Sequence, residues 1–141
     1  AQKFQHEAPS KVWQQLFRAR NYFDGGYYDR AIAALDELNK LPGALTEGDR
    51  AEAAYRYGRI YHSRGQILDA MVVYEECTSR EVEEDRTWLQ AYSWYFQGVI
   101  SRQLGKDAQA KTQFEKALSY DDYFYQGGLE NRCKAAMNEM K

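Results

Sequence analysis

The feature that most constrains this chain is a set of glycines at nearly equal intervals. Gly26, Gly65 and Gly105 lie 39 and 40 residues apart. An alanine follows each glycine after five residues, and a large side chain follows each alanine after four. These residues are Ala31, Ala70 and Ala110, then Leu35, Tyr74 and Phe114. Landmarks that recur in register predict a stack of similar repeats, because a single repeat of this size cannot bury its own apolar face.

The segments on either side of these glycines carry apolar residues at the spacing of a helix. Leu16, Ala19 and Phe23, for example, fall on one face at a period of 3.6 residues. No segment has the β-branched alternation of a strand, and only two prolines occur in 141 residues. We therefore expect an all-α fold. Its helices are predicted at about residues 12–23, 28–40, 47–63, 67–80, 85–103, 107–120 and 129–140.

A small residue lies seven positions before each repeated glycine. These residues are Ala19, Gly58 and Gly98. In a pair of facing helices, small residues allow the axes to approach to about 8 Å. The repeated glycine itself ends the first helix of each pair in a backbone conformation that is costly for other residues. Thr46 followed by Asp49 resembles a helix N-terminal cap. The pattern thus predicts closely packed helical hairpins.

Together these positions resemble the tetratricopeptide repeat (TPR), whose pattern is W-x2-L-G-x2-Y, then A-x3-F and then P. The third repeat matches at Trp94, Gly98, Gly105, Ala110, Phe114 and Ala117. The second matches at Gly58, Tyr61, Gly65, Ala70 and Tyr74, and the first at Ala19, Tyr22, Gly26 and Ala31. The resemblance covers about residues 12–120. It implies a TPR-like α-solenoid of right-handed stacked hairpins, whose activity is protein binding and not catalysis.

The repeat length departs from the 34 residues of the family, and the additional residues fall between repeats. The first junction contains Pro42 and Gly43, so we expect a loop there. The second junction, residues 78–87, contains neither proline nor glycine. We therefore predict helices lengthened by about one turn at that junction.

The organisation predicted along the chain is a flexible arm followed by one TPR-like domain. The arm covers residues 1–11 and the domain residues 12–141. Within the domain, the repeats span about residues 12–45, 46–84 and 85–122, and a capping helix spans about 129–140. The alternative for this last helix is the first helix of a further repeat.

Composition excludes several classes of function. A net charge of −2 and a pI of about 5.7 do not provide the basic surface of a nucleic-acid-binding protein. No apolar run is long enough to insert into a membrane. No phosphate-binding, zinc-protease or dinucleotide motif is present, so we expect no enzyme, no cofactor and no metal. Cys77 and Cys133 are too few for a disulfide framework, and we predict that both thiols are buried.

The first helix of each hairpin is expected to line a concave face. Aromatic residues alternate with arginines at the positions that point to this face, and such surfaces combine rigid contact area with bidentate donors for carboxylates. The residues that we predict to bind a partner are Arg20, Tyr55, Arg56, Arg59, Tyr92, Tyr95 and Arg102. The hypothesis is a protein or peptide partner with an acidic or C-terminal segment. In the alternative, Arg56 only pairs with Glu52 and the tyrosines only pack.

The carboxylate clamp of the TPR proteins that bind chaperone tails is absent as a set, since the matching positions read Leu16, Arg20, Arg56, Tyr92 and Phe96. Two other functions stay open: a homodimeric scaffold, and an accessory domain of a larger protein. Because the chain begins at Ala1 and not at a methionine, we expect that a signal peptide, a tag or the rest of a longer protein preceded it. The two cysteines favour the cytoplasm, whereas a cleaved signal would indicate export.

Overall fold

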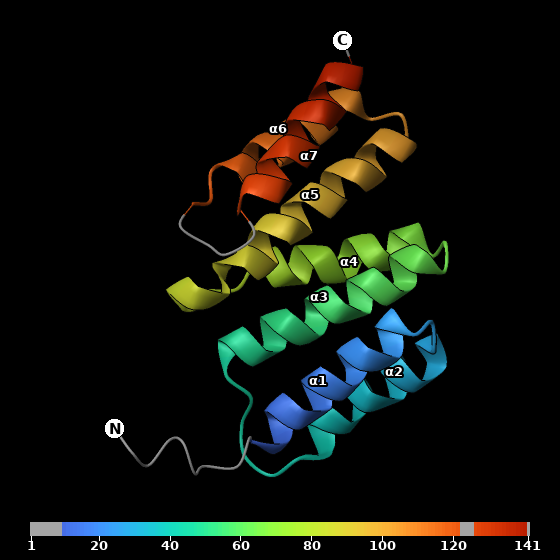
Figure 1. The fold of residues 1–141 in the computed structure, drawn as a ribbon, viewed down its shortest axis with the longest axis vertical. Coiled ribbons are helices and arrows are strands. Elements are labelled where there is room, and N and C mark those ends of the chain that lie inside the picture. The colour runs from blue at the N-terminus through green and yellow to red at the C-terminus, as the bar shows by residue number, and fades with distance from the viewer. Residues whose placement is uncertain (1–9, 122–125, 141) are drawn as a thin grey trace. The chain divides into compact units, whose positions relative to one another are not determined.

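The structure is a computed structural model that describes residues 10–121 and 126–140. Every regular element in these residues is a helix, as the sequence predicted. The helices are α1 (Lys11–Asp24), α2 (Tyr28–Asp36), α3 (Glu47–Ser63), α4 (Ile67–Thr78), α5 (Thr87–Gln103), α6 (Asp107–Leu118) and α7 (Gln126–Glu139) (Figure 1). Most of the expected N-terminal arm, residues 1–9, lies outside the described residues. The first helix begins at Lys11, one residue earlier than the periodicity suggested.

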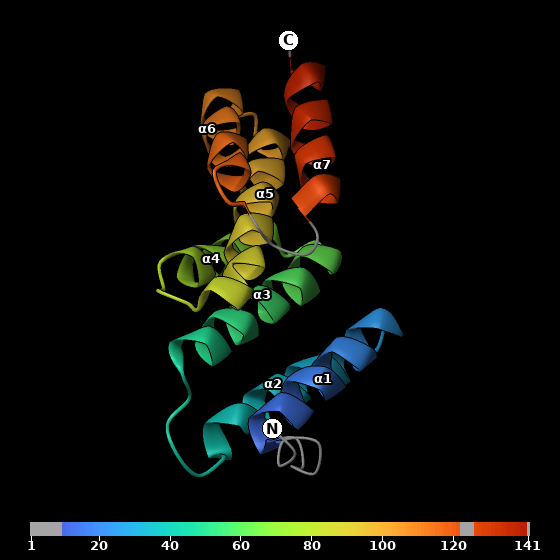
Figure 2. The same cartoon turned by 60° about the vertical axis from the view of Figure 1, so that its left-hand side comes forward.

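The chain divides into two compact parts, residues 1–45 and residues 46–141. The N-terminal part contains the hairpin of α1 and α2. The C-terminal part contains the α3–α4 and α5–α6 hairpins and α7, which packs against both α5 and α6 (Figure 2). The irregular segment 41–46 separates the two parts, where the sequence predicted a loop.

Two helices begin with side-chain caps that the local sequence supplies. The Ser10 hydroxyl accepts a hydrogen bond from the backbone N–H of Trp13 at 3.0 Å, at the start of α1. At the start of α3, Thr46 and Asp49 form the reciprocal capping box that their spacing indicated. Each cap satisfies backbone N–H groups that have no partner inside the helix.

The three repeated glycines end the first helix of each hairpin with the same turn. Gly26, Gly65 and Gly105 have φ angles of 82°, 78° and 77°, a region that penalises residues with a Cβ atom. After each glycine, the next backbone N–H donates to the carbonyl five residues earlier, at 2.8 Å in all three hairpins. The shared turn confirms that the sequence landmarks mark equivalent structural positions.

Gly58 and Gly98 are required by ring contacts inside their hairpins. A Cβ atom on Gly58 would lie 2.4 Å from the Tyr74 ring, and one on Gly98 would lie 2.6 Å from the Phe114 ring. Both rings are fully buried. The large residue of the repeat therefore packs on the small residue of the partner helix.

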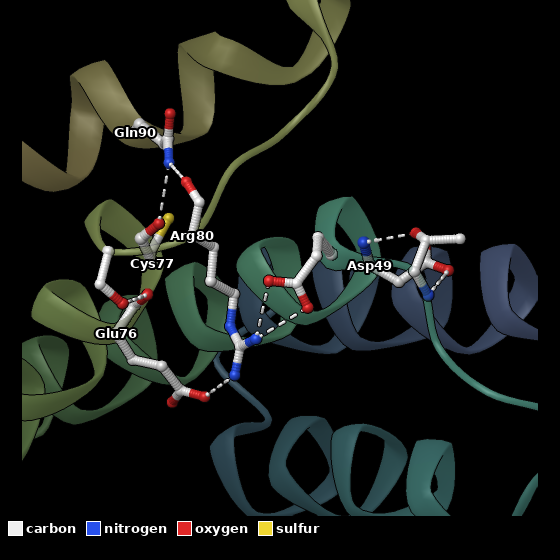
Figure 3. Close-up of polar contacts among 8 residues, drawn as sticks. Asp49, Glu76, Cys77, Arg80 and Gln90 are labelled. Atoms are coloured by element: carbon white, nitrogen blue, oxygen red, sulfur yellow. Dashed lines mark hydrogen bonds and ion pairs between the residues drawn. The ribbon is translucent and has the colours of Figure 1, made fainter.

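The prediction of lengthened helices at the second junction is wrong. Helix α4 ends at Thr78, and a 3-10 turn at Glu84–Arg86 precedes α5. The hydroxyls of Thr78 and Ser79 hydrogen-bond to backbone carbonyls of the last turn of α4, where they compete with continuation of the helix. The Gln90 side-chain amide donates to the carbonyls of Cys77 and Arg80, which fixes the chain as it leaves α4 (Figure 3).

Helix α7 repeats the register of α5 at an offset of 40 residues. Leu129 and Cys133 are buried, as are Leu89 and Ser93 at the equivalent positions of α5. Positions through which α5 faces its partner helix α6 are occupied in α7 by exposed polar residues. These residues are Asn131, Lys134 and Asn138, which correspond to Ala91, Trp94 and Gly98. This polar outer face agrees with a capping helix, which stays a prediction.

Candidate protein-binding face

An aromatic cluster fills the junction between α3 and α5, with Phe96 at its centre. The Phe96 ring stacks on Tyr74, with centroids 5.6 Å apart and planes 15° apart. The edge of the His62 ring contacts Phe96 at 5.7 Å, and the Arg59 guanidinium carbon lies 4.0 Å from the Phe96 centroid. A guanidinium stacked on a ring presents its N–H groups at its edge, in the geometry that suits a carboxylate.

Tyr55 lies beneath this cluster instead of on its surface. Only 7% of Tyr55 is exposed, and its ring contacts Tyr74, Trp88 and Phe96 at centroid distances of 5.8–6.5 Å. Burial raises the pKa of Tyr55 to about 12, although Arg59 and Arg56 oppose the shift. The predicted role of Tyr55 in direct partner contact is therefore corrected to support of the residues above it, because a buried ring offers little contact area.

His62 and Tyr74 form the polar edge of the same cluster. The Tyr74 hydroxyl lies 3.4 Å from His62 Nδ1. Burial, assisted by the positive charge of Arg59, lowers the pKa of His62 below its ordinary value. Burial also raises the pKa of Tyr74. Both side chains are therefore held in their neutral forms near neutral pH.

Arg56 belongs to a chain of alternating charges that links α3 to the start of α5. Its guanidinium donates to Glu52 Oε2 from Nε at 3.2 Å and from Nη2 at 3.1 Å. The other oxygen of Glu52 accepts from Arg86 at 2.8 Å, and Arg86 also contacts Asp49 at 2.9 Å. The pair of Arg56 and Glu52 that was considered as an alternative is thus present, and an acidic ligand would have to compete with Glu52 for this arginine.

Arg86 was missed by the sequence analysis, because its partners lie 34 and 37 residues earlier in the chain. The only local signal is Gly48, where a Cβ atom would lie 2.8 Å from Arg86 Nη1. A second arginine, Arg80, connects the two helices of the second hairpin, α3 and α4. It contacts Glu76 at 2.9 Å and Glu47 at 3.0 Å (Figure 3). Arg80 thus links the helices within the second hairpin, whereas Arg86 links that hairpin to the start of α5.

A hollow of about 590 Å³ opens between α5 and α7. The residues that line it are Tyr95, Val99, Arg102, Gln103, Phe114, Arg132, Ala135, Ala136 and Glu139. Arg102 Nη1 lies 2.7 Å from Glu139 Oε2, and both side chains are substantially exposed. Such a pair contributes about 0–1 kcal/mol, so a ligand carboxylate can replace Glu139 at little cost.

Three of the predicted residues, Arg59, Tyr95 and Arg102, form one region with Phe96 in the C-terminal part of the chain. The centroids of the Tyr95 and Phe96 rings lie 5.1 Å apart, and the Arg59 guanidinium lies over the Phe96 ring. Tyr95 also lines the hollow together with Arg102. Tyr92 contacts Trp88 at 6.3 Å, one turn before Tyr95. We call Arg59, Phe96, Tyr95 and Arg102 the arginine–aromatic row.

Arg20, the remaining predicted residue, belongs to the N-terminal part of the chain. It is exposed and lies 3.9 Å from Asp24, one turn later in α1. On the same helix, the rings of Trp13 and Phe17 stack with centroids 4.9 Å apart, and about half of each side chain is exposed.

The repeated hairpins, their shared turns and their small-on-aromatic contacts define a helical-repeat protein. The tetratricopeptide repeat family matches the chain at residues 51–81 and 91–123. The chain is therefore a TPR protein, and TPR proteins are typically non-catalytic protein–protein interaction modules. No curated protein and no solved structure matches the chain.

Two further findings concern residues 10–121 and 126–140. None of the helices in this part of the chain combines the length and apolar character needed to span a bilayer. The same residues contain no cluster of three or more His, Cys, Asp or Glu side chains that could hold a metal ion.

Proposed function

We propose that the surface presented by α3, α5 and α7 binds a segment of a partner protein that carries an acidic side chain or a free C-terminus. The observation that carries this proposal is the arginine–aromatic row. Its two arginines lie at either end of two adjoining aromatic rings, so charge recognition and apolar contact area occur on one surface. Tyrosine, tryptophan and arginine are the residues most enriched at the energetic centres of protein interfaces.

The two arginines of the row suit different parts of this role. Arg59 is held by the Phe96 ring at 4.0 Å, which reduces the side-chain entropy lost on binding. Arg102 contacts Glu139 in an exposed pair, so exchange of Glu139 for a ligand carboxylate leaves the total number of charge pairs unchanged. Arg56 is a weaker candidate, because Glu52 already binds it on a largely buried surface.

The test is selection of random short peptides on the immobilised chain, followed by affinity measurements with the enriched peptides. We expect enriched peptides to contain Asp or Glu, or to need a free C-terminus. The double variant Arg59→Ala, Arg102→Ala should weaken their binding by at least about tenfold, since each charge-assisted hydrogen bond contributes about 1.5–3 kcal/mol.

Two matched variants control for charge and for geometry. Arg50→Ala removes the same charge from an exposed position on α3 and should leave peptide affinity unchanged. Arg59→Lys keeps the charge but loses the planar stacking group, and it should weaken binding nearly as much as Arg59→Ala. Equal affinities for all of these variants, or enrichment of basic peptides, would contradict the proposal.

A further inference from the structure

The hollow between α5 and α7 occupies the position that is filled by Phe96 between α3 and α5. At an offset of 40 residues, Tyr95 corresponds to Tyr55, Arg102 to His62 and Phe114 to Tyr74. At the α3–α5 junction the first members of this set, Tyr55, His62 and Tyr74, all contact the Phe96 ring. At the α5–α7 junction their equivalents line the hollow.

The residue that corresponds to Phe96 explains why this space is open. It is Ala136, and the neighbouring Tyr95 corresponds to Ala135. Both alanines line the hollow. Helix α7 keeps the buried anchors Leu129 and Cys133, so it occupies the place of a first helix but lacks the two rings that such a helix inserts.

On this basis, and resting on the function proposed above, we propose that the hollow receives an aromatic side chain from the partner segment. The incoming ring takes the place of Phe96 and contacts Tyr95 and the Ala136 methyl group, whereas Phe114 is fully buried beneath Tyr95 and supports the wall of the hollow. An aromatic pair of this kind contributes beyond its buried area, which favours an aromatic over an aliphatic side chain of similar size.

The charges around the hollow indicate which residues lie next to the aromatic residue in the partner segment. Arg102 and Arg132 both line it, against the single carboxylate of Glu139. A carboxylate adjacent to the aromatic residue can bind these arginines. The partner segment is therefore of the type aromatic residue followed or preceded by Asp, Glu or the C-terminal carboxylate.

The smallest probe that carries both groups is N-acetylphenylalanine, which has one ring and one carboxylate. Titration of the full chain, followed by NMR of the Ala135 and Ala136 methyl groups, should give a Kd on the order of a millimolar. N-acetylleucine should bind about 3–10-fold more weakly, because it lacks the ring. N-acetylphenylalaninamide should also bind more weakly, because it lacks the charge.

The decisive variant is Ala136→Phe, which supplies the missing ring from the chain itself. We expect this variant to abolish binding of N-acetylphenylalanine and to raise Tm, because its side chain fills the hollow. Ala136→Met, with a flexible side chain that adapts to irregular spaces, should block the probe if Ala136→Phe does not fold. Unchanged binding in the folded variant, or equal affinity for N-acetylleucine, would overturn the inference.

Peptides selected for the proposed function separate failure of this inference from failure of that function. If acidic peptides without aromatic residues bind, lose affinity in the Arg59→Ala, Arg102→Ala variant and bind Ala136→Phe normally, then the surface binds partners but the aromatic subsite is wrong. If neither acidic peptides nor N-acetylphenylalanine bind, both proposals fall together.

Discussion

The α3–α5 and α5–α7 junctions have the same arrangement of helices but different contents. In the first, Phe96 is 9% exposed and contacts rings from two helices, with Arg59 above it. In the second, Ala135 and Ala136 line a hollow of about 590 Å³. The comparison teaches that a helical repeat opens a core position when two rings are replaced by alanines, since the other helices still supply the surrounding wall.

The largest effect is expected when the filled junction is converted into a copy of the open one. Phe96→Ala should reduce the free energy of unfolding of the C-terminal part by about 3–5 kcal/mol, from lost burial and the remaining cavity. Denaturant titration with amide exchange in α3 and α5 measures it. Leu104→Ala, at a residue that is 41% exposed, serves as the control and should cost far less. A small loss for Phe96→Ala would mean that the junction does not depend on this ring.

A pair of substitutions, Gly98→Ala in α5 and Asn138→Ala in α7, compares a position in close contact with a ring and the equivalent exposed position. Gly98→Ala places a Cβ atom 2.6 Å from the Phe114 ring, and we expect a loss of about 1–3 kcal/mol from overpacking. Thermal or denaturant unfolding measures it. Asn138→Ala changes the corresponding exposed position of α7 and should be neutral or slightly stabilising, because alanine is the better helix former. Equal effects at the two positions would contradict the assigned register.

The two junctions should also differ in their response to pH. The pKa of His62 is lowered in the folded chain, so the unfolded chain binds the proton first, and stability should fall as pH drops below the ordinary value of 6.5. The equivalent position of the open junction carries Arg102 instead of a histidine. The free energy of unfolding, measured from neutral pH to pH 5, should therefore depend less steeply on pH in His62→Gln than in the unaltered chain. An unchanged slope would show that His62 does not titrate on unfolding.

The smallest expected effect concerns the charge pair at the rim of the open junction. Glu139→Gln removes the partner of Arg102, and the free energy of unfolding should change by less than about 1 kcal/mol, because the pair is exposed. The same substitution should strengthen binding of N-acetylphenylalanine, since the probe no longer displaces Glu139. Isothermal calorimetry compares the two affinities, and weaker binding in the variant would show that Glu139 does not compete with the ligand.

The helices and their turns were predictable because their signals are local. Thr46 and Asp49 cap a helix within one turn, and the repeated glycines end helices whatever packs beside them. The second junction was mispredicted because only prolines and glycines were considered as helix breakers. The hydroxyls of Thr78 and Ser79 also act at the end of α4, and the Gln90 side chain on α5 hydrogen-bonds to the carbonyl of Cys77. Hydrogen bonds that close over such distances depend on the fold.

The candidate site was predictable only as a set of positions on one helix face. Spacing placed Arg59, Tyr95 and Arg102 on one helix-lined surface, and it gave Tyr55 the same status although this ring is buried. Helical periodicity assigns a direction to each side chain and cannot tell how far the next helix covers it. The ion pairs of Arg86 with Asp49 and Glu52 could not be predicted for the same reason, because they join residues of different helices.

By itself, the sequence determined the repeat: all-α hairpins, left-handed glycine turns and rings packed on small residues, since each follows from spacing within about 40 residues. Tertiary structure decided which equivalent positions became core and which became surface. Phe96 and Ala136 have the same place in the repeat, yet only Phe96 closes its junction with a ring. That difference arises because the side chain that closes each junction comes from the next helix in the stack. The effect of a small residue such as Ala136 is therefore seen only when the helices are packed together.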